Sequence, residues 1–159
     1  MGQDWFMTRG MAEDGWRLAR TRLADALRAG AANPNIPLAE ALYWLSVVED
    51  DEEKKIGSSA YYGHRSGSTE GETVGALVFA RNLITHDLIS PAELNVRGAY
   101  GSAAYGSAAY GGSAEWHWKR RSELGNPTDK YGRDALYDKH VAGGHVDSPL
   151  QAAERFFGL

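Results

Sequence analysis

The sequence predicts an all-α protein, a bundle of about five helices with one long loop rich in glycine, serine, alanine and tyrosine. Apolar residues recur at helical spacing in five separate segments, and no segment makes a convincing strand. The length of 159 residues suits one domain with one hydrophobic core. We therefore expect residues 1–159 to form a single helical domain.

The first two helices are expected on either side of a turn at residues 33–35. Residues 13–28 form the first, because apolar side chains return there at helical spacing. These side chains are Trp16, Ala19, Leu23, Ala26 and Leu27. Gly30 and the Asn-Pro-Asn turn end this helix. Pro37 suits the first position of the second helix, whose end is expected within the charged run 49–55.

The third helix is the most apolar of the chain and is expected near the centre of the bundle. Residues 57–71 before it hold glycine, serine and tyrosine without periodicity, which predicts a loop. Thr69 and Glu72 have the spacing of a capping box, so the helix is expected to begin near Ser68 or Thr69. It runs to about Ile89, where the following Ser-Pro pair ends it.

Two shorter helices are expected near the end of the sequence, over residues 133–142 and 148–157. In the second of these, Ser148 is a suitable N-cap and Pro149 stands at the first helical position. Its apolar face is supplied by Leu150, Ala153, Phe156 and Phe157. These segments complete the predicted set of five helices.

A five-residue unit, Gly-Ser-Ala-Ala-Tyr, is repeated between the third and fourth helices. Its tyrosines, Tyr100, Tyr105 and Tyr110, cannot share one helix face, because five residues turn a helix by about 140° beyond a full circle. The favoured interpretation is a flexible low-complexity insert at about residues 97–115. The alternative is a row of tyrosines that stack on bases or hold a partner.

The composition excludes several classes of protein and site. A net charge of −4 argues against a protein coated with cationic surface for duplex DNA. No cysteine is present, so neither a disulfide framework nor a thiolate metal site can form. The sequence shows no signal peptide and no apolar stretch of bilayer-spanning length. We therefore expect a cytoplasmic protein with no membrane partner.

The segment Arg81-Asn82-Leu83-Ile84-Thr85-His86 carries the chemistry that stands out. Asn82 and His86 are four residues apart and share one face of the third helix. Arg81 lies about 140° around from His86, but its long side chain can turn toward that face. Histidine can move protons at the 2′-oxygen or the leaving 5′-oxygen of RNA. A guanidinium can stabilise the charge that develops on the phosphorus centre.

This segment resembles the ribonuclease motif of HEPN domains, which are helical bundles. In that motif an arginine and a polar residue, often asparagine, are followed by a histidine after four to six intervening residues. The resemblance implies that Arg81, Asn82 and His86 cleave RNA without a metal or cofactor, in a cleft shared by a symmetric homodimer. It also implies a toxin or defence effector, with an antitoxin or other protein as a further partner. The alternative is a non-catalytic helical binding or inhibitor protein that acts through a protein partner.

A weaker candidate site for RNA follows the repeat. Trp116 and Trp118 alternate with polar residues and precede three cations, Lys119, Arg120 and Arg121. Stacking surfaces beside cations are typical of a single-stranded RNA-binding patch. Tryptophans in such a pattern are more often core anchors, and we favour that interpretation for the two tryptophans.

Two further groups of residues are not expected to form a functional site. His140 and His145 lack a carboxylate at a familiar metal-ligand spacing, so we expect no metal site. The acidic run 49–53 could supply a carboxylate that orients His86. A solvated helix end is the favoured interpretation of this run, because two lysines follow it.

Overall fold

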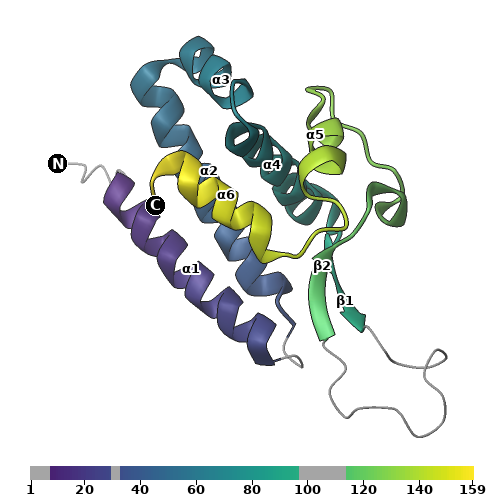
Figure 1. The fold of residues 1–159 in the computed structure, drawn as a ribbon. Helices are drawn as coiled ribbons and strands as arrows, with labels where there is room; N and C mark the ends of the chain where they lie inside the picture. Colours follow the sequence, from purple (N-terminus) through teal and green to yellow (C-terminus); the bar gives the residue numbers. More distant parts are fainter. Residues whose placement is uncertain (1–7, 30–32, 97–113) are drawn as a thin grey trace, which may run out of the picture.

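The computed structural model describes residues 8–29, 33–96 and 114–159, and these form the all-α bundle that the sequence predicts (Figure 1). Within these ranges the helices are α1 (Arg9–Ala29), α2 (Asn35–Ile56), α3 (Ser58–Ser66), α4 (Thr69–Asp87), α5 (Arg133–His140) and α6 (Asp147–Phe157). A two-stranded sheet, β1 (Ala92–Val96) and β2 (Ala114–Trp118), and a 3₁₀ helix, η1 (Arg121–Leu124), complete the described elements.

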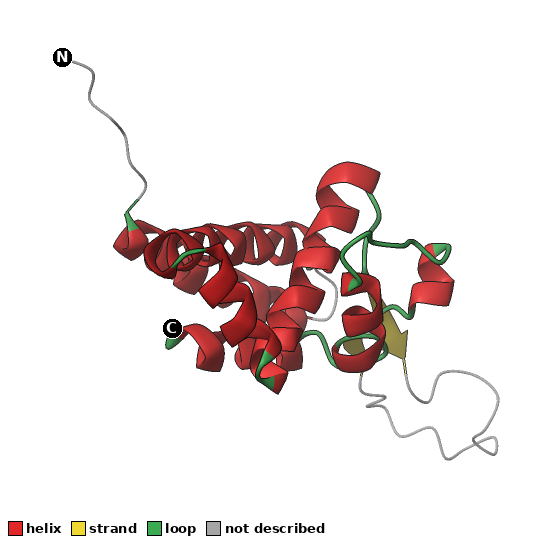
Figure 2. Ribbon diagram, turned by 90° about the horizontal axis from the view of Figure 1, so that it is seen from above, coloured by secondary structure: helices red, strands yellow, loops and turns green. Residues whose placement is uncertain are grey.

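Helix α4 lies at the centre of the bundle, as predicted. It packs against α2, α3, α5 and α6, while α6 lies between α1 and α4 (Figure 1). Every residue of α4 from Thr73 to Ala80 is buried, as expected of a helix that is apolar on all sides. Figure 2 shows the hairpin of β1 and β2 at one end of the bundle and the C-terminus toward the other.

Helix α3 corrects the prediction of a loop over residues 57–71. The helix packs against α2 and α4, and Tyr61 is its only fully buried residue. A nine-residue helix with one anchor shows no apolar stripe, so periodicity could not reveal it. Tertiary packing of Tyr61 supplies the stability that local sequence does not.

The hairpin of β1 and β2 corrects a second prediction, because the sequence shows no convincing strand. β1 pairs with β2 in antiparallel register, with Ala92 opposite Trp118 and Val96 opposite Ala114. Both strands alternate apolar and polar residues over only five positions. β2 takes in the last two residues of the predicted insert at 97–115, while residues 97–113, with the three repeat tyrosines, lie outside the described part of the chain.

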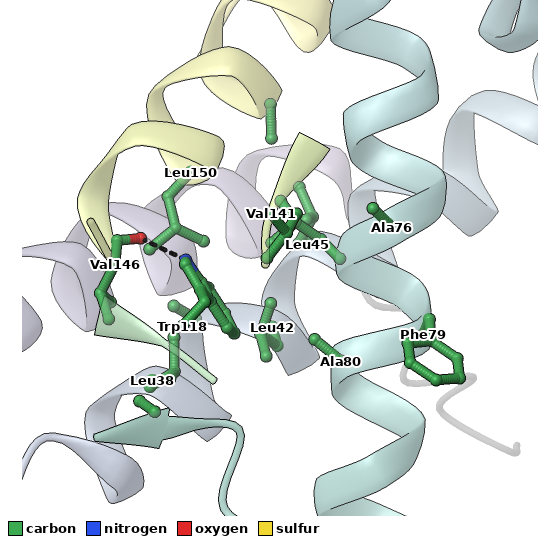
Figure 3. Close-up of a cluster of buried hydrophobic side chains, with 14 of the residues drawn as sticks. Leu38, Leu42, Leu45, Ala76, Phe79, Ala80, Trp118, Val141, Val146 and Leu150 are labelled. Atoms are coloured by element: carbon green, nitrogen blue, oxygen red, sulfur yellow. Dashed lines mark hydrogen bonds between the residues drawn. The ribbon is translucent and has the colours of Figure 1, made fainter. Parts of the chain in front are cut away.

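The core is one contiguous cluster to which the long helices, the hairpin and the C-terminal segment all contribute. Trp118 stands at its centre, beside Leu38 and Leu42 of α2, Ala80 of α4 and Leu150 of α6 (Figure 3). Burying a side chain of this size contributes more than any aliphatic neighbour can. The hairpin is therefore held on the bundle by its own buried indole.

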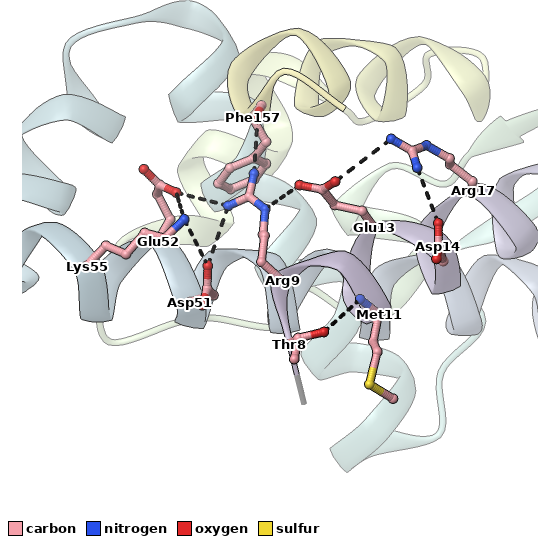
Figure 4. A network of polar contacts seen from close by, with 10 residues as sticks. All are labelled: Thr8, Arg9, Met11, Glu13, Asp14, Arg17, Asp51, Glu52, Lys55 and Phe157. Atoms are coloured by element: carbon pink, nitrogen blue, oxygen red, sulfur yellow. Dashed lines mark hydrogen bonds and ion pairs between the residues drawn. The ribbon is translucent and has the colours of Figure 1, made fainter. Parts of the chain in front are cut away.

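Ion pairs close the bundle where α1 meets α2 and α6. The Arg9 guanidinium binds Glu13 at 2.7 Å and Glu52 at 2.9 Å, and donates to the carbonyl of Phe157 at 3.2 Å (Figure 4). Glu52 belongs to the acidic run 49–53, for which the sequence favours a solvated helix end. At least part of that run instead joins two helices.

Candidate functional site

The motif helix begins and ends with identifiable caps. The side chain of Ser68 accepts a 3.0 Å hydrogen bond from the Gly71 N–H, so Ser68 is the N-cap. At the other end Leu88 takes a left-handed conformation with a φ of 53°, and the Ile89 N–H reaches back to the Leu83 carbonyl at 3.0 Å. Residues 85–88 next to this cap are exposed, so the end of α4 lies at the surface.

The three motif residues lie where α4 passes from buried to exposed. Arg81 and Asn82 are half-buried, whereas His86 is exposed. Arg81 Nη2 donates a 2.9 Å hydrogen bond to Asn82 Oδ1. Arg81 Nε is enclosed and has no hydrogen-bond partner among the described residues. The Thr85 hydroxyl donates to the Arg81 carbonyl at 3.0 Å, which keeps it on the helix backbone.

The hydrogen bond between Arg81 and Asn82 decides the direction of the guanidinium. Asn82 and His86 are four residues apart and so project from one face of the helix. Because Arg81 reaches the side chain of Asn82, its charge lies on that same side. The arrangement can present a fixed cation and an exposed imidazole to one phosphodiester.

A small apolar pocket opens beside this last turn. It has a volume of about 190 Å³ and is lined by Asn35, Ile84, Leu88, Ile89 and Ser90. Leu88 is 89% exposed, and Ile36, next to the pocket residue Asn35, is 73% exposed. Apolar periodicity counts Leu88 as part of the buried face, but the left-handed conformation of this residue turns it outward, so the sequence pattern does not predict this surface.

The two tryptophans that were candidates for RNA binding pack in or against the hydrophobic core. Trp118 is 1% exposed and its Nε1 donates to the Val146 carbonyl at 3.1 Å, so it offers no surface to a base. Trp116 is half-buried against the core, with its Nε1 enclosed. Both residues stand on the core-facing side of β2, because alternate residues of a strand share a face. The core-anchor interpretation describes them.

The three cations after β2 differ in whether they form ion pairs. Arg121 pairs with Asp134 at 2.5 Å and with Asp138 at 2.9 Å. Lys119 and Arg120 have no ion pair within the described ranges. The Lys119 N–H bonds to the carbonyl of Pro91, only a few residues beyond the motif helix, at 2.8 Å. The chain thus brings the basic segment near the exposed end of α4.

His140 and His145 each contact a group elsewhere in the chain. His140 Nε2 lies 2.6 Å from Glu72 Oε2, a carboxylate that is 68 residues away in the sequence. His145 Nδ1 accepts a 3.2 Å hydrogen bond from the Asp147 N–H. The acidic run does not orient His86 through Glu49, because that carboxylate accepts from Tyr61 and Arg65. Across the described residues, no three histidines or carboxylates gather where they could hold a metal ion.

Comparison with protein-family models, with curated proteins and with solved structures finds no match for this chain. None of the helices in the described ranges combines the length and the apolar character needed to cross a membrane. Function is therefore inferred from the geometry of the site.

Proposed function

We propose that this protein is a metal-independent endoribonuclease of the HEPN type, acting through Arg81, Asn82 and His86. The observation that carries the proposal is the 2.9 Å hydrogen bond from Arg81 to Asn82, beside an exposed His86 one helical turn further on. A core arginine would be expected to pair with a carboxylate, whereas Arg81 pairs with a neutral amide and keeps its charge available.

Each residue has a distinct role in the proposed reaction. The imidazole of His86 moves a proton at the attacking 2′-oxygen or at the leaving 5′-oxygen. The Arg81 guanidinium stabilises the negative charge that builds on the phosphoryl oxygens. Asn82 positions Arg81 through its side-chain oxygen. RNA is the substrate, and a role as a toxin or defence effector follows if the target is essential to the cell.

The test compares His86→Ala with Asp87→Ala, an exposed neighbour on the same turn. Loss of a general acid–base group should lower RNA cleavage by about a hundredfold or more, while the control keeps its rate. Cleavage should persist in EDTA, and circular dichroism should be the same for all three proteins. Undiminished cleavage by a folded His86→Ala protein contradicts the assignment.

A second candidate function is that of a binding or inhibitor protein. It is favoured by the exposed Leu88 and Ile36 beside the 190 Å³ apolar pocket, because such patches mark protein interaction sites. Growth after expression separates the two functions. The nuclease requires that His86→Ala relieves growth arrest. A binding protein requires that Leu88→Asp relieves it and that His86→Ala does not.

A further inference from the structure

A polar cavity lies between η1 and the end of α5. Its volume is about 350 Å³, within the range that holds a small organic ligand. It is lined by Arg120, Arg121, Ser122, Asn126, Asp138 and Ala142. The chemistry of these six residues decides which ligand the cavity can take.

Arg121 is fixed in place by two carboxylates. Its Nη1 lies 2.5 Å from Asp134 and its Nη2 lies 2.9 Å from Asp138. These bonds commit Asp138, the only carboxylate that lines the cavity, to a guanidinium. Arg121 Nε is enclosed and has no hydrogen-bond partner among the described residues. The Arg121 guanidinium is therefore held in one orientation and forms one wall of the cavity.

Arg120 supplies the charge that is not neutralised. The nearby carboxylate of Glu123 accepts the backbone N–H of Arg120 at 2.5 Å and has no ion pair with its guanidinium. The side chain is exposed and has no ion pair within the described ranges. Arg120 Nε lies beside Gly143, 3.6 Å from where a Cβ on that glycine would stand. The guanidinium is thus free to meet a ligand in the cavity.

The remaining polar lining adds donors. Ser122 contributes a hydroxyl and Asn126 an amide. Asn126 has a left-handed backbone conformation with a φ of 54°. Its N–H donates a 2.9 Å hydrogen bond to the Arg121 carbonyl, which stabilises this turn. Arg121 is already bonded to Asp134 and Asp138, so the groups left to donate to a ligand are the Arg120 guanidinium, the Ser122 hydroxyl and the Asn126 amide. Such a surplus of donors suits an anion with several oxygen acceptors.

We propose that this cavity binds a phosphate ester of a nucleotide, with Arg120 as the principal contact. Resting on the proposed function, the ester belongs to the RNA substrate and the cavity is a second contact for the strand. The Lys119 N–H bonds to the Pro91 carbonyl, and the five residues from His86 to Pro91 can span at most about 18 Å. The segment that carries Arg120 therefore lies within reach of an RNA strand bound at His86. The same chemistry would accept a free nucleotide.

The experiment measures binding apart from cleavage. A fluorescein-labelled single-stranded RNA with 2′-O-methyl groups, which cannot be cut at the 2′-oxygen, is titrated with each variant in the His86→Ala protein. Arg120→Ala should weaken binding by about tenfold or more, the usual loss for a charge-assisted hydrogen bond pair, and should lower the salt dependence by about one phosphate contact. Arg120→Lys should restore part of the affinity. Arg17→Ala, which removes an exposed arginine on α1, is the control.

The outcomes separate this proposal from the nuclease assignment. Binding that depends on Arg120 supports the cavity even if the wild-type protein cuts no RNA. Cleavage that depends on His86, with RNA affinity unchanged in Arg120→Ala, overturns the contact between the cavity and the RNA strand and leaves the nuclease standing. In a parallel calorimetric titration, AMP that binds wild type and not Arg120→Ala supports the site and identifies free nucleotide as a ligand. Equal affinity of Arg120→Ala and the control for both RNA and AMP overturns the proposal.

Discussion

The indole Nε1 of Trp118 donates a 3.1 Å hydrogen bond to the carbonyl of Val146, which fastens the end of β2 to the turn before α6 (Figure 3). The backbone strengthens this link, since the Val146 N–H bonds to the Trp116 carbonyl at 3.0 Å and the Trp118 N–H to Gly144 at 2.8 Å. One buried side chain thus positions the hairpin, the turn and the last helix together.

Truncation of this anchor should be among the most damaging single changes. We expect Trp118→Ala to lower the free energy of unfolding by about 3–5 kcal/mol, because it leaves a large cavity. Trp118→Phe should cost less, about 1–3 kcal/mol, since it mainly leaves the Val146 carbonyl unpaired. Urea denaturation measures both. Leu18→Ala, at a residue that is 52% exposed on α1, should change the free energy by less than about 0.5 kcal/mol.

Glu49 is a buried carboxylate whose partners are Tyr61 at 3.1 Å and Arg65 at 2.6 Å. Burial raises the pKa of the Glu49 carboxyl, against the attraction of Arg65. Arg65→Ala should therefore destabilise the fold by about 3–5 kcal/mol, because it leaves a buried charge unpaired. Adding Glu49→Leu to that variant should recover much of the loss. Additive losses in the double variant would show that the two residues do not act as a pair.

Glu72 joins the start of α4 to the end of α5. Hydrogen bonds from Lys139 and His140 hold the pKa of its carboxyl below the usual 4.5. A carboxylate whose pKa falls on folding stabilises the fold above its unfolded pKa, and this contribution is lost as pH falls through the folded pKa. Wild type should therefore exceed Glu72→Gln in stability at pH 7, by a margin that shrinks below about pH 4.5. A margin independent of pH in urea titrations would contradict this reading of the contact.

The repeat between β1 and β2 allows a test of the predicted insert. Removing one Gly-Ser-Ala-Ala-Tyr unit shortens the 17 residues from 97 to 113 to 12. For a flexible connection the change in closure entropy amounts to only about 0.3 kcal/mol. We therefore expect the melting temperature and any RNA cleavage to be unchanged. A fall of more than several degrees would mean that the tyrosines pack into the fold.

The HEPN resemblance implies a homodimer, and the burial of α4 restricts where the second copy can contact that helix. Residues 73–80 are buried within one chain, so within Thr73–Ile89 a second copy can contact only residues 81–89, of which 85–88 are exposed. An interface there would include Leu88. We predict a dimer in light scattering at micromolar concentration, reduced to the 17.3 kDa monomer by Leu88→Asp and unaffected by Leu18→Asp. A wild-type monomer that cuts RNA would exclude a shared cleft.

Much of the fold could be predicted because its determinants are local. Apolar periodicity predicts the long helices, and the start of α4 near Ser68 or Thr69 follows from polar residues only a few positions apart. In the candidate site, helix geometry places Asn82 and His86 on one face, whereas the direction of the Arg81 guanidinium follows from its hydrogen bond to Asn82. Sequence alone determined the central helix and which of its residues could do chemistry.

Only the tertiary structure decided the elements that depend on distant partners. The hairpin exists because Trp118 finds a core built by other helices, and α3 because Tyr61 does the same. The bond from His140 to Glu72 spans 68 residues, and the cavity at Arg120 joins η1 to α5. Contacts of this kind depend on which side chains the packed helices bring together. A repeating pattern along the chain does not encode pairings between residues so far apart in the sequence.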